Sequence, residues 1–400
     1  MRPLSCKIMN SGRYVFAQVA DFIPRYEFDR IVRKYNGDYH VRELSCYNLF
    51  LHLMFGQLTA CDSIRDICLC LKAHQKILYP LGFRQTVNVS SLSRANRDRD
   101  CRIWEELGLV PIGIVRPLYA NEPVPDVDLP GWEIFAIDST TVSCSIKLMM
   151  WAYGKYDRGA VKMHAVLDLR GSIPAFIHVT HGKWHDSNML DVIEIIPWAI
   201  YVMDKAYVDF AALYNISNRD AYWVTRAKSN MRYEVVDVNY NIDRSTGLVS
   251  DRTIRLTGYK PSKLYPENFR MVEFTDPDNG EVLAFITNLT EVGPLDVANL
   301  YRNRWQIETF FKWIKQNLTV KSFWGHSENA VKTHLWTAIC TYLIVARIKA
   351  SIKDCPYTIT EVATLLGVSA LSKADLTTLL TNPQNDLLNQ NQDVNEPTLF

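Results

Sequence analysis

The 400-residue sequence predicts a mixed α/β protein in which a helical N-terminal domain precedes a sheet that is interrupted by a β-rich insertion. Three observations support this fold class. Apolar residues recur at helical spacing in the first quarter, short β-branched and aromatic runs follow, and a later stretch alternates in strand fashion between turn signals. Strands that alternate with helices indicate a mixed sheet.

Residues 1–110 are expected to form the helical domain. Within it, "PLGFRQTVNVSSLSRANRDRDCRIW" predicts a turn followed by a serine-capped helix that opens with Ser91, Arg94, Asn96 and Arg97. Arg and Asn are the side chains that contact guanine and adenine edges in a major groove. One interpretation is a DNA-reading helix-turn-helix, and the other is an ordinary charged surface helix.

Residues 125–230 follow the Pro-rich linker "NEPVPDVDLPGW" and are expected to form the first part of the core. Five runs predict strands: "EIFAID", "VKMHAVLDL", "IPAFIHVTH", "AIYVMD" and "AYWVTRAK". Two runs predict helices between the later strands, "DSNMLDVIEII" and "DFAALYNIS". The order is three strands in a meander, then strand and helix in alternation.

Residues 231–295 are expected to form the β-rich insertion, without a helix, because they alternate in strand fashion around turn signals such as "DPDNGE". Residues 296–348 would complete the core and carry the amphipathic helix "LYRNRWQIETFFKWIKQNL". Residues 349–400 predict a small helical segment and an Asn/Gln-rich, disordered tail.

Composition limits the cellular setting. The net charge is +1, but Lys and Arg exceed Asp and Glu over residues 1–102, which favours a polyanionic partner. Nine scattered cysteines without paired CxxC spacing argue for reduced thiols rather than disulfides or a zinc ribbon. The N-terminus lacks the apolar stretch of a signal peptide, and "LWTAICTYLIVARI" is too short to span a bilayer. We therefore expect a soluble cytoplasmic protein without membrane contact.

The helix at residues 300–318 presents a polar row. Tyr301, Arg304, Glu308 and Lys315 fall within an arc of about 60° on a helical projection, and apolar residues fall on another arc. The row is either a solvated face with an Arg304–Glu308 pair, or a site in which Glu308 binds a metal and the other three hold a phosphate backbone.

Two aspartates are candidate partners for Glu308. Asp138 ends the apolar run "IFAID" and Asp204 ends "IYVMD", and α/β sheets bind ligands beyond the carboxyl ends of their strands. Each aspartate alone is equally a turn former or helix cap. Together, the three carboxylates suit two Mg²⁺ or Mn²⁺ ions that activate an oxygen nucleophile for in-line phosphoryl transfer.

These residues carry a family resemblance. "YRNRWQIETFFKWIK" resembles the Y-x2-R-x3-E-x6-K signature of DDE transposases of the insertion-sequence-four class, and "AIDSTTV" and "VMDKAY" resemble the segments around their two aspartates. The order of strand-Asp, strand-Asp, β-insertion and helix-Glu is similar to their RNase H-like core. "GRYVFAQVADFIPRYEFDRIVRKYNGD" and "FGQLTACDSIRDI" resemble the helical domain that precedes the core in bacterial members.

The resemblance implies a function and a role for each residue. The protein would cut DNA at the ends of its own insertion sequence and join the 3′-hydroxyl ends to target DNA, as at least a homodimer in the DNA complex. Asp138, Asp204 and Glu308 would bind the metals. The DNA end and backbone would be held by Tyr301, Arg304 and Lys315.

Departures from the family leave the later steps open. Some members form a DNA hairpin with an insertion-domain Trp, but residues 231–300 contain none, so Tyr265, Phe274 or Phe285 would have to replace it. Lys205 stands where members often have Gly. The alternatives are an RNase H-like nuclease that does not join DNA, and a catalytically silent DNA-binding protein.

Three histidines raise a separate possibility. His178, His181 and His185 are close in sequence, but on a predicted strand and turn they would not share one face in zinc geometry. Packing and hydrogen bonding beneath the site is the favoured role.

Overall fold

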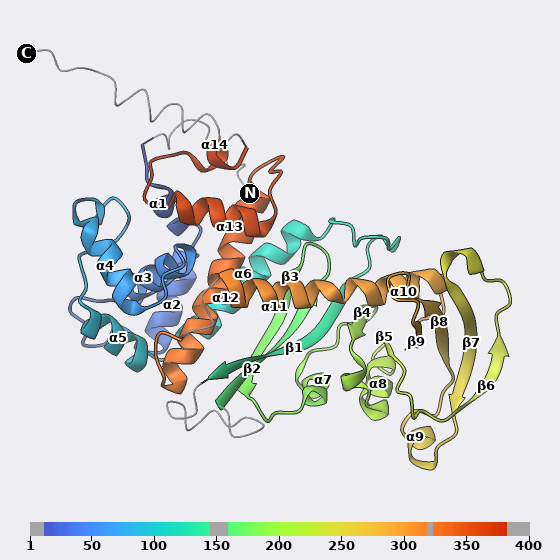
Figure 1. Cartoon of the computed structure of the whole chain (residues 1–400). Helices are drawn as coiled ribbons and strands as arrows, with labels where there is room; N and C mark the ends of the chain where they lie inside the picture. The colour runs from blue at the N-terminus through green and yellow to red at the C-terminus, as the bar shows by residue number, and fades with distance from the viewer. Residues whose placement is uncertain (1–11, 145–158, 318–322, 382–400) are drawn as a thin grey trace, which may run out of the picture. The chain divides into compact units, whose positions relative to one another are not determined.

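The computed structural model describes residues 12–144, 159–317 and 323–381. The chain divides into two compact units. The helical unit contains the described residues up to Leu118 and from Lys312 onward, and the sheet unit contains those from Tyr119 to Phe311 (Figure 1). The Asn/Gln-rich tail, which was predicted to be disordered, lies outside the described residues.

The helical unit combines both ends of the described chain. Its main helices are α1 (Val15–Ala20), α2 (Arg25–Lys34), α3 (Cys46–Leu58), α4 (Ile64–Ala73), α5 (Val89–Asp98), α6 (Arg102–Val115), α12 (Glu328–Ser351), α13 (Ile359–Val368) and α14 (Leu376–Thr381). Short 3₁₀ turns are η1 (Gln75–Ile77) and η2 (Arg116–Tyr119), of which the last residue belongs to the sheet unit.

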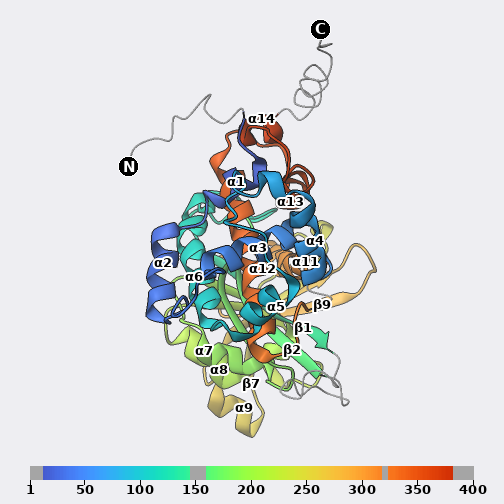
Figure 2. The same cartoon turned by 90° about the vertical axis from the view of Figure 1, so that its left-hand side faces the viewer.

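Helix α12 is the centre of this unit. It contacts α3, α5, α6 and α13, and Figure 2 shows it among them. It is buried around most of its circumference, which explains why its sequence is apolar on every side. The segment "LWTAICTYLIVARI" is therefore a core helix, as predicted. In the part of the chain that the structure describes, no helix combines the length and the apolarity that a membrane crossing needs.

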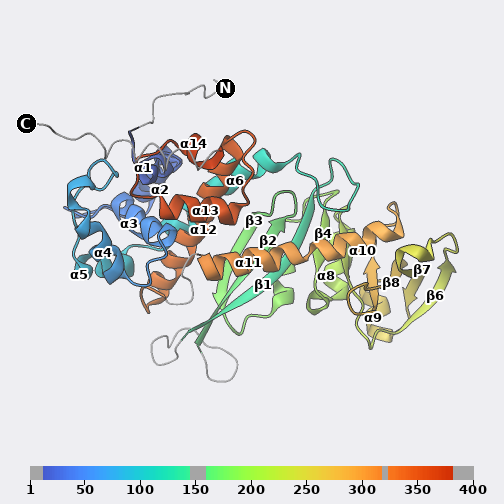
Figure 3. The same cartoon turned by 45° about the horizontal axis from the view of Figure 1, so that its top comes forward.

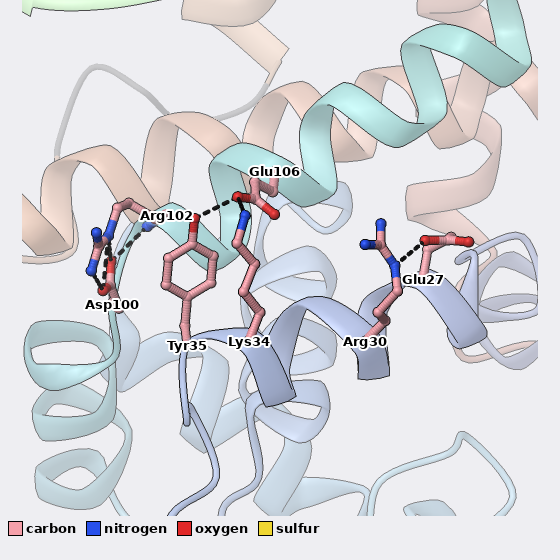
Figure 4. A network of polar contacts seen from close by, with 7 residues as sticks. All are labelled: Glu27, Arg30, Lys34, Tyr35, Asp100, Arg102 and Glu106. Atoms are coloured by element: carbon pink, nitrogen blue, oxygen red, sulfur yellow. Dashed lines mark hydrogen bonds and ion pairs between the residues drawn. The ribbon is translucent and has the colours of Figure 1, made fainter.

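Helices α2 and α6 are joined by a polar network (Figure 4). Lys34 and Tyr35, at the end of α2, both donate to the carboxylate of Glu106 on α6. The guanidinium of Arg102 lies 4.8 Å from the centre of the Tyr35 ring and also binds Asp100. Because both cations of the network are exposed to solvent, its ion pairs add little to the free energy of unfolding.

Gly367 marks the close approach of α13 to the end of α3. A Cβ atom there would lie 2.1 Å from the carbonyl oxygen of Leu58. This oxygen belongs to the backbone, so no change of side-chain rotamer can relieve the clash. We expect Gly367→Ala to lower the free energy of unfolding by about 1–3 kcal/mol. Gly113→Ala on α6 is the control, because nothing lies within 4 Å and helix propensity favours Ala by up to about 1 kcal/mol. Urea unfolding measures the free energy of unfolding of both variants. Equal changes in the two variants would contradict the prediction.

The described part of the sheet unit contains one nine-stranded sheet in the order β3-β2-β1-β4-β5-β9-β8-β7-β6. The strands are β1 (Ile134–Cys144), β2 (Gly159–Asp168), β3 (Ile173–His181), β4 (Ile200–Met203), β5 (Tyr222–Arg226), β6 (Tyr233–Val238), β7 (Leu248–Leu256), β8 (Phe269–Thr275) and β9 (Val282–Thr287). β1 to β3 form an antiparallel meander, and β4 and β5 run parallel to β1. This five-strand arrangement is the expected RNase H-like core.

The two faces of the sheet carry different helices. Alternate residues of β1 and β4, among them Ile137 and Met203, face an apolar core shared with α7 (Met189–Val192) and α8 (Phe210–Ser217). α10 (Pro294–Asn303) contacts β4, β5, β8 and β9 and runs on into α11 (Trp305–Asn317), as Figure 3 shows. Shorter elements are η5 (Asp186–Asn188), η6 (Lys205–Tyr207), η7 (Arg244–Thr246) and α9 (Tyr259–Leu264).

The insertion at residues 231–295 differs from the prediction in one way: it contains the helix α9, although no helix was predicted there. Its last strand, β9, pairs with β5, so the insertion extends the core sheet. Strand alternation identifies the strands but contains no information on which strand pairs with which.

Two further local predictions were wrong. The cap of α5 is Asn88, whose Oδ1 accepts from the N–H of Ser91, and not a serine. The run "DSNMLDVIEII" forms only η5 and one turn of helix, and it becomes extended at Ile193. Of residues 296–348, which were predicted as the second part of the core, α12 packs among the helices of the helical unit.

Candidate active site

The two aspartates lie at the end of the parallel pairing between β1 and β4. That pairing ends at Ile137 and Met203, and Asp138 and Asp204 are the next residue on each strand. Asp204 follows its strand directly, as predicted, and its Oδ1 also caps η6 by accepting from the N–H of Ala206. The prediction that Asp138 ends its strand was wrong, because β1 continues to Cys144 in a hairpin with β2.

The predicted single helix from Leu300 is broken at Arg304. The N–H of Arg304 bonds to the carbonyl of Tyr301, and the N–H of Ile307 bonds to the carbonyl of Arg304, both at 3.1 Å. These bonds span three residues instead of four, so the turn is tightened between α10 and α11. Leu318, the last residue of the predicted apolar arc, lies outside the described residues.

Arg304 joins the two segments of the site. Its Nη1 donates to Asp138 Oδ2 at 3.1 Å, and its Nη2 donates to Glu308 Oε1 at 2.7 Å. The Arg304 side chain is only 13% exposed. One guanidinium therefore connects β1 to the first turn of α11, across 166 positions of sequence.

Negative charge is concentrated around Asp138. The pKa of this carboxyl is raised to about 6, mainly by burial and in addition by the charges of Glu308 and Asp204. The Ser139 N–H and Arg304 oppose the shift. The negative charges of Glu308 and Asp204 thus both act on Asp138, with Arg304 as the partly compensating cation. This repulsion is what a bound cation would relieve.

The donor set fits a hard divalent ion, since all three candidate ligands are carboxylates. Among the described residues, no group of three His, Cys, Asp or Glu side chains is gathered as closely as a metal site requires. Arg304 lies between two of the candidates. The arrangement is that of two carboxylates bridged by an internal cation, with Asp204 at the end of the neighbouring strand.

The raised pKa of Asp138 predicts a pH-dependent stability. A carboxyl that binds its proton more tightly in the folded state stabilises the fold below the unfolded pKa, and this contribution is lost as pH rises through about 6. Asp138→Asn removes the buried charge. We expect this variant, without metal, to be more stable than the wild type by about 2 kcal/mol at neutral pH.

The measurement is urea unfolding in a chelator at several pH values. The advantage of Asp138→Asn should shrink from neutral pH towards about pH 4 and be smallest below it, where the wild-type carboxyl becomes protonated in both states. An advantage of the same size at every pH would contradict the electrostatic explanation.

Tyr301 belongs to the same site, whereas Lys315 is less closely tied to it. The Tyr301 ring packs against Phe285 with ring centres 4.8 Å apart, and the Arg304 guanidinium lies 5.6 Å from its centre. Burial raises the pKa of Tyr301, and the charge of Asp204 adds to the effect. Lys315 lies two turns beyond Glu308 on α11, and partial burial lowers its pKa.

The candidate DNA-reading residues on α5 separate into two groups. Arg94 and Arg97 are exposed, and Arg97 pairs with Asp98 at 2.7 Å. Asn96 is only 1% exposed and lies on the face of α5 that packs inward. In this conformation its amide cannot reach a base edge, so the three residues do not form one reading face.

The three histidines singled out in the sequence do not converge. His178 and His181 are on β3, and His185 caps η5, where its Nδ1 pairs with Ser187. The ring of His178 packs near Trp184, with ring centres 5.7 Å apart. No zinc cluster exists within the described ranges.

Sequence reasoning missed a polar cluster next to Asp138. It contains Ser139, Lys162, His164 and Asp186, joined by hydrogen bonds and ion pairs. Lys162 and His164 are two positions apart on β2 and so point to the same face, as "VKMH" indicates once a strand is assigned. The pairing of β2 with β1 was the missing information.

Comparisons with known proteins agree with this geometry. The family model of the transposase DDE domain matches residues 130–344, and that of a domain of unknown function, DUF4372, matches residues 11–84. Because the first match covers more than half of the chain, it shows that the protein contains a transposase DDE domain. The chain belongs to this family.

Individual relatives cover part of the chain. "Putative transposase y4zB" of Sinorhizobium fredii is 34% identical over 212 residues, which are 52% of this chain and 59% of that protein. "Probable transposase for insertion sequence element IS5377" of Geobacillus stearothermophilus is 30% identical over 210 residues, 52% of this chain and 55% of that protein. The matches thus span less than two thirds of these relatives.

A solved structure is also similar. It is the cryo-EM structure of the piggyBac transposase synaptic complex with hairpin DNA, at a TM-score of 0.49 and 11% identity, covering 98% of this chain and 88% of that one.

Proposed function

We propose that this protein is a metal-dependent DNA strand transferase that cleaves DNA at the ends of an insertion sequence and joins the 3′-hydroxyl ends to target DNA. The observation that carries the proposal is that Arg304 bridges the carboxylates of Asp138 and Glu308, which come from separate elements. The charge of Asp204, at the end of the neighbouring strand, also acts on Asp138. Membership of the DDE transposase family supports the same reaction class.

Asp138, Asp204 and Glu308 are the residues that would hold Mg²⁺ or Mn²⁺, two ions in our proposal. Bound ions of this kind activate an attacking oxygen and stabilise the leaving oxygen in phosphoryl transfer. The chain supplies the carboxylates on rigid elements: a strand, a strand end and the first turn of a helix. No side-chain nucleophile is needed.

Arg304 and Tyr301 are proposed to hold the DNA end. A guanidinium offers a planar set of donors that matches phosphate as well as carboxylate, so Arg304 can bind the backbone next to the carboxylates. The pKa of Tyr301 is affected by the charge of Asp204, and the Tyr301 ring lies 5.6 Å from the Arg304 guanidinium. Lys315 is proposed as a further backbone contact along α11.

The helical unit is proposed to recognise the ends through Arg94 and Arg97 of α5. Asn96 is excluded from this role because it is buried. Two DNA ends must be held together for joining, so we propose a homodimer in the DNA complex. We place the reaction in the cytoplasm, where bacterial DNA lies.

The test is incubation of the full chain with DNA that flanks its own gene, with Mg²⁺, with Mn²⁺ or with a chelator. Metal-dependent nicks at both ends, with 3′-hydroxyls, followed by joined products are the expected result. Nicks without joined products would replace the proposal by a nuclease. End-specific binding without cleavage in any metal would replace it by a DNA-binding protein.

A further inference from the structure

A polar cluster lies behind β1, on the opposite face of the sheet from Asp138. Ser139 follows Asp138 in the strand, so its side chain points to the other face. The Ser139 hydroxyl donates to Asp186 Oδ1 at 2.5 Å. The same carboxylate oxygen lies 2.7 Å from Lys162 Nζ and 3.7 Å from His164 Nδ1. Asp186 is therefore the point at which β1 and β2 are joined to η5.

The members of this cluster are held firmly. His164 is fully buried, and its Nε2 pairs with Thr180 Oγ1 at 3.0 Å. Lys162 is 13% exposed and also donates to the carbonyl of Trp184 at 3.3 Å. Burial raises the pKa of Asp186, but hydrogen bonds from Lys162 and Ser139 outweigh it, so the pKa is lowered. Asp186 is a charged, fixed acceptor.

Strand β1 lacks a strand neighbour on one side at this point. Its pairing with β4 ends at Ile137, so Asp138 and Ser139 have no β4 residue beside them. The Ser139 N–H donates to Asp138 Oδ1 at 2.8 Å and so orients that carboxylate. A chain of contacts runs from Asp186 through the Ser139 hydroxyl and the Ser139 amide to Asp138.

We infer that Asp186 is a positioning residue for Asp138, which it controls by holding Ser139 in place from behind the sheet. The inference rests on the proposed role of Asp138 as a metal ligand. Residues that orient a ligand in this way change metal affinity by about 10–100-fold when they are replaced. The sequence motif "HDS" thus contributes to the site without contacting substrate.

The test measures Mn²⁺ binding by electron paramagnetic resonance on the full chain, without DNA. We expect Asp186→Ala to weaken Mn²⁺ binding by about 10-fold or more. Ser139→Ala should weaken it in the same direction, and Ser139→Thr, which keeps the hydroxyl, should restore it. Asp191→Ala is the matched control, because Asp191 is an exposed carboxylate on α7, and it should leave binding unchanged.

The double variant separates positioning from a general structural role. If Asp186 acts through Ser139, Asp186→Ala combined with Ser139→Ala should bind Mn²⁺ no more weakly than Asp186→Ala alone. The inference would be overturned if the losses of Mn²⁺ affinity in the two single variants multiplied in the double variant. It would also be overturned if Asp186→Ala bound Mn²⁺ with wild-type affinity. Asp186→Ala could fail to fold because Lys162 loses its partner. In that case the Mn²⁺ affinities of Ser139→Ala and Ser139→Thr test the inference, and equal affinities would overturn it.

Mn²⁺ binding and DNA cleavage are separate measurements, so the inference and the proposed function fail separately. Non-additive loss of Mn²⁺ binding in a protein that cuts no DNA would support the positioning role and refute the strand transferase. If Ser139→Ala changed neither the metal-dependent cleavage nor the Mn²⁺ affinity, the positioning role would be refuted and the proposed enzyme activity would stand.

Discussion

Replacing Glu308 by Gln is expected to lower the rate of metal-dependent DNA cleavage by about 10³-fold or more, while binding of the DNA ends stays intact. Gln keeps the shape of the side chain, and its oxygen still accepts the hydrogen bond from Arg304 that Glu308 accepts at 2.7 Å. It lacks the negative charge that a divalent ion requires of its ligand. We therefore expect Glu308→Gln to lower the rate of metal-dependent cleavage without destabilising the fold.

Single-turnover nicking in excess protein measures this loss, and a gel shift without divalent metal measures DNA binding. Glu328→Gln is the matched control, because Glu328 is a half-exposed helix carboxylate that pairs with Lys332 four residues on. It should leave the nicking rate unchanged. A Glu308→Gln protein that nicks within about 10-fold of the wild-type rate would exclude Glu308 as a metal ligand.

The sequence could predict the elements of the site because their signals are local. A short apolar run of β-branched and aromatic residues that ends in Asp204 is recognisable within a few positions, and so is the helical spacing of Tyr301, Arg304 and Glu308. The order of these elements along the chain then indicated a sheet with carboxylates at one end.

What the sequence could not predict depends on contacts between distant residues. The hydrogen bond from Arg304 to Asp138 joins residues 166 positions apart. The pairing of β9 with β5 depends on the topology of the sheet, which local sequence does not contain. The burial of Asn96 depends on which face of α5 packs inward. Local periodicity describes each element alone, so it contains neither the partner nor the register.

Replacing Arg270 by Met is expected to lower the free energy of unfolding by about 3–5 kcal/mol. Arg270 on β8 binds both carboxylate oxygens of Asp251 on β7, at 2.8 and 2.9 Å, and the two residues are 8% and 3% exposed. Met would leave the Asp251 charge buried without its cation. It would also remove the donor to the carbonyl of Val292, now at 2.7 Å.

Urea unfolding of Arg270→Met measures this loss, and two further variants test its cause. Arg252→Met breaks a more exposed pair with Glu273 on the same two strands and should cost less than about 1 kcal/mol. Arg270→Met combined with Asp251→Leu removes both buried charges and should recover part of the stability. A double variant as unstable as the sum of its single variants would argue against an ion-pair effect.

The same bonds connect the insertion to the proposed chemistry. Val292 immediately precedes Gly293, the cap of α10, and α10 leads through Tyr301 to Arg304. By donating to Val292, Arg270 fixes the start of the helix whose end bears the guanidinium of the site. Arg270→Met should therefore weaken Mn²⁺ binding even at temperatures where the chain is still folded, whereas Arg252→Met should not. In this view the inserted strands support the helix that leads to Arg304, the cation that bridges the two carboxylates.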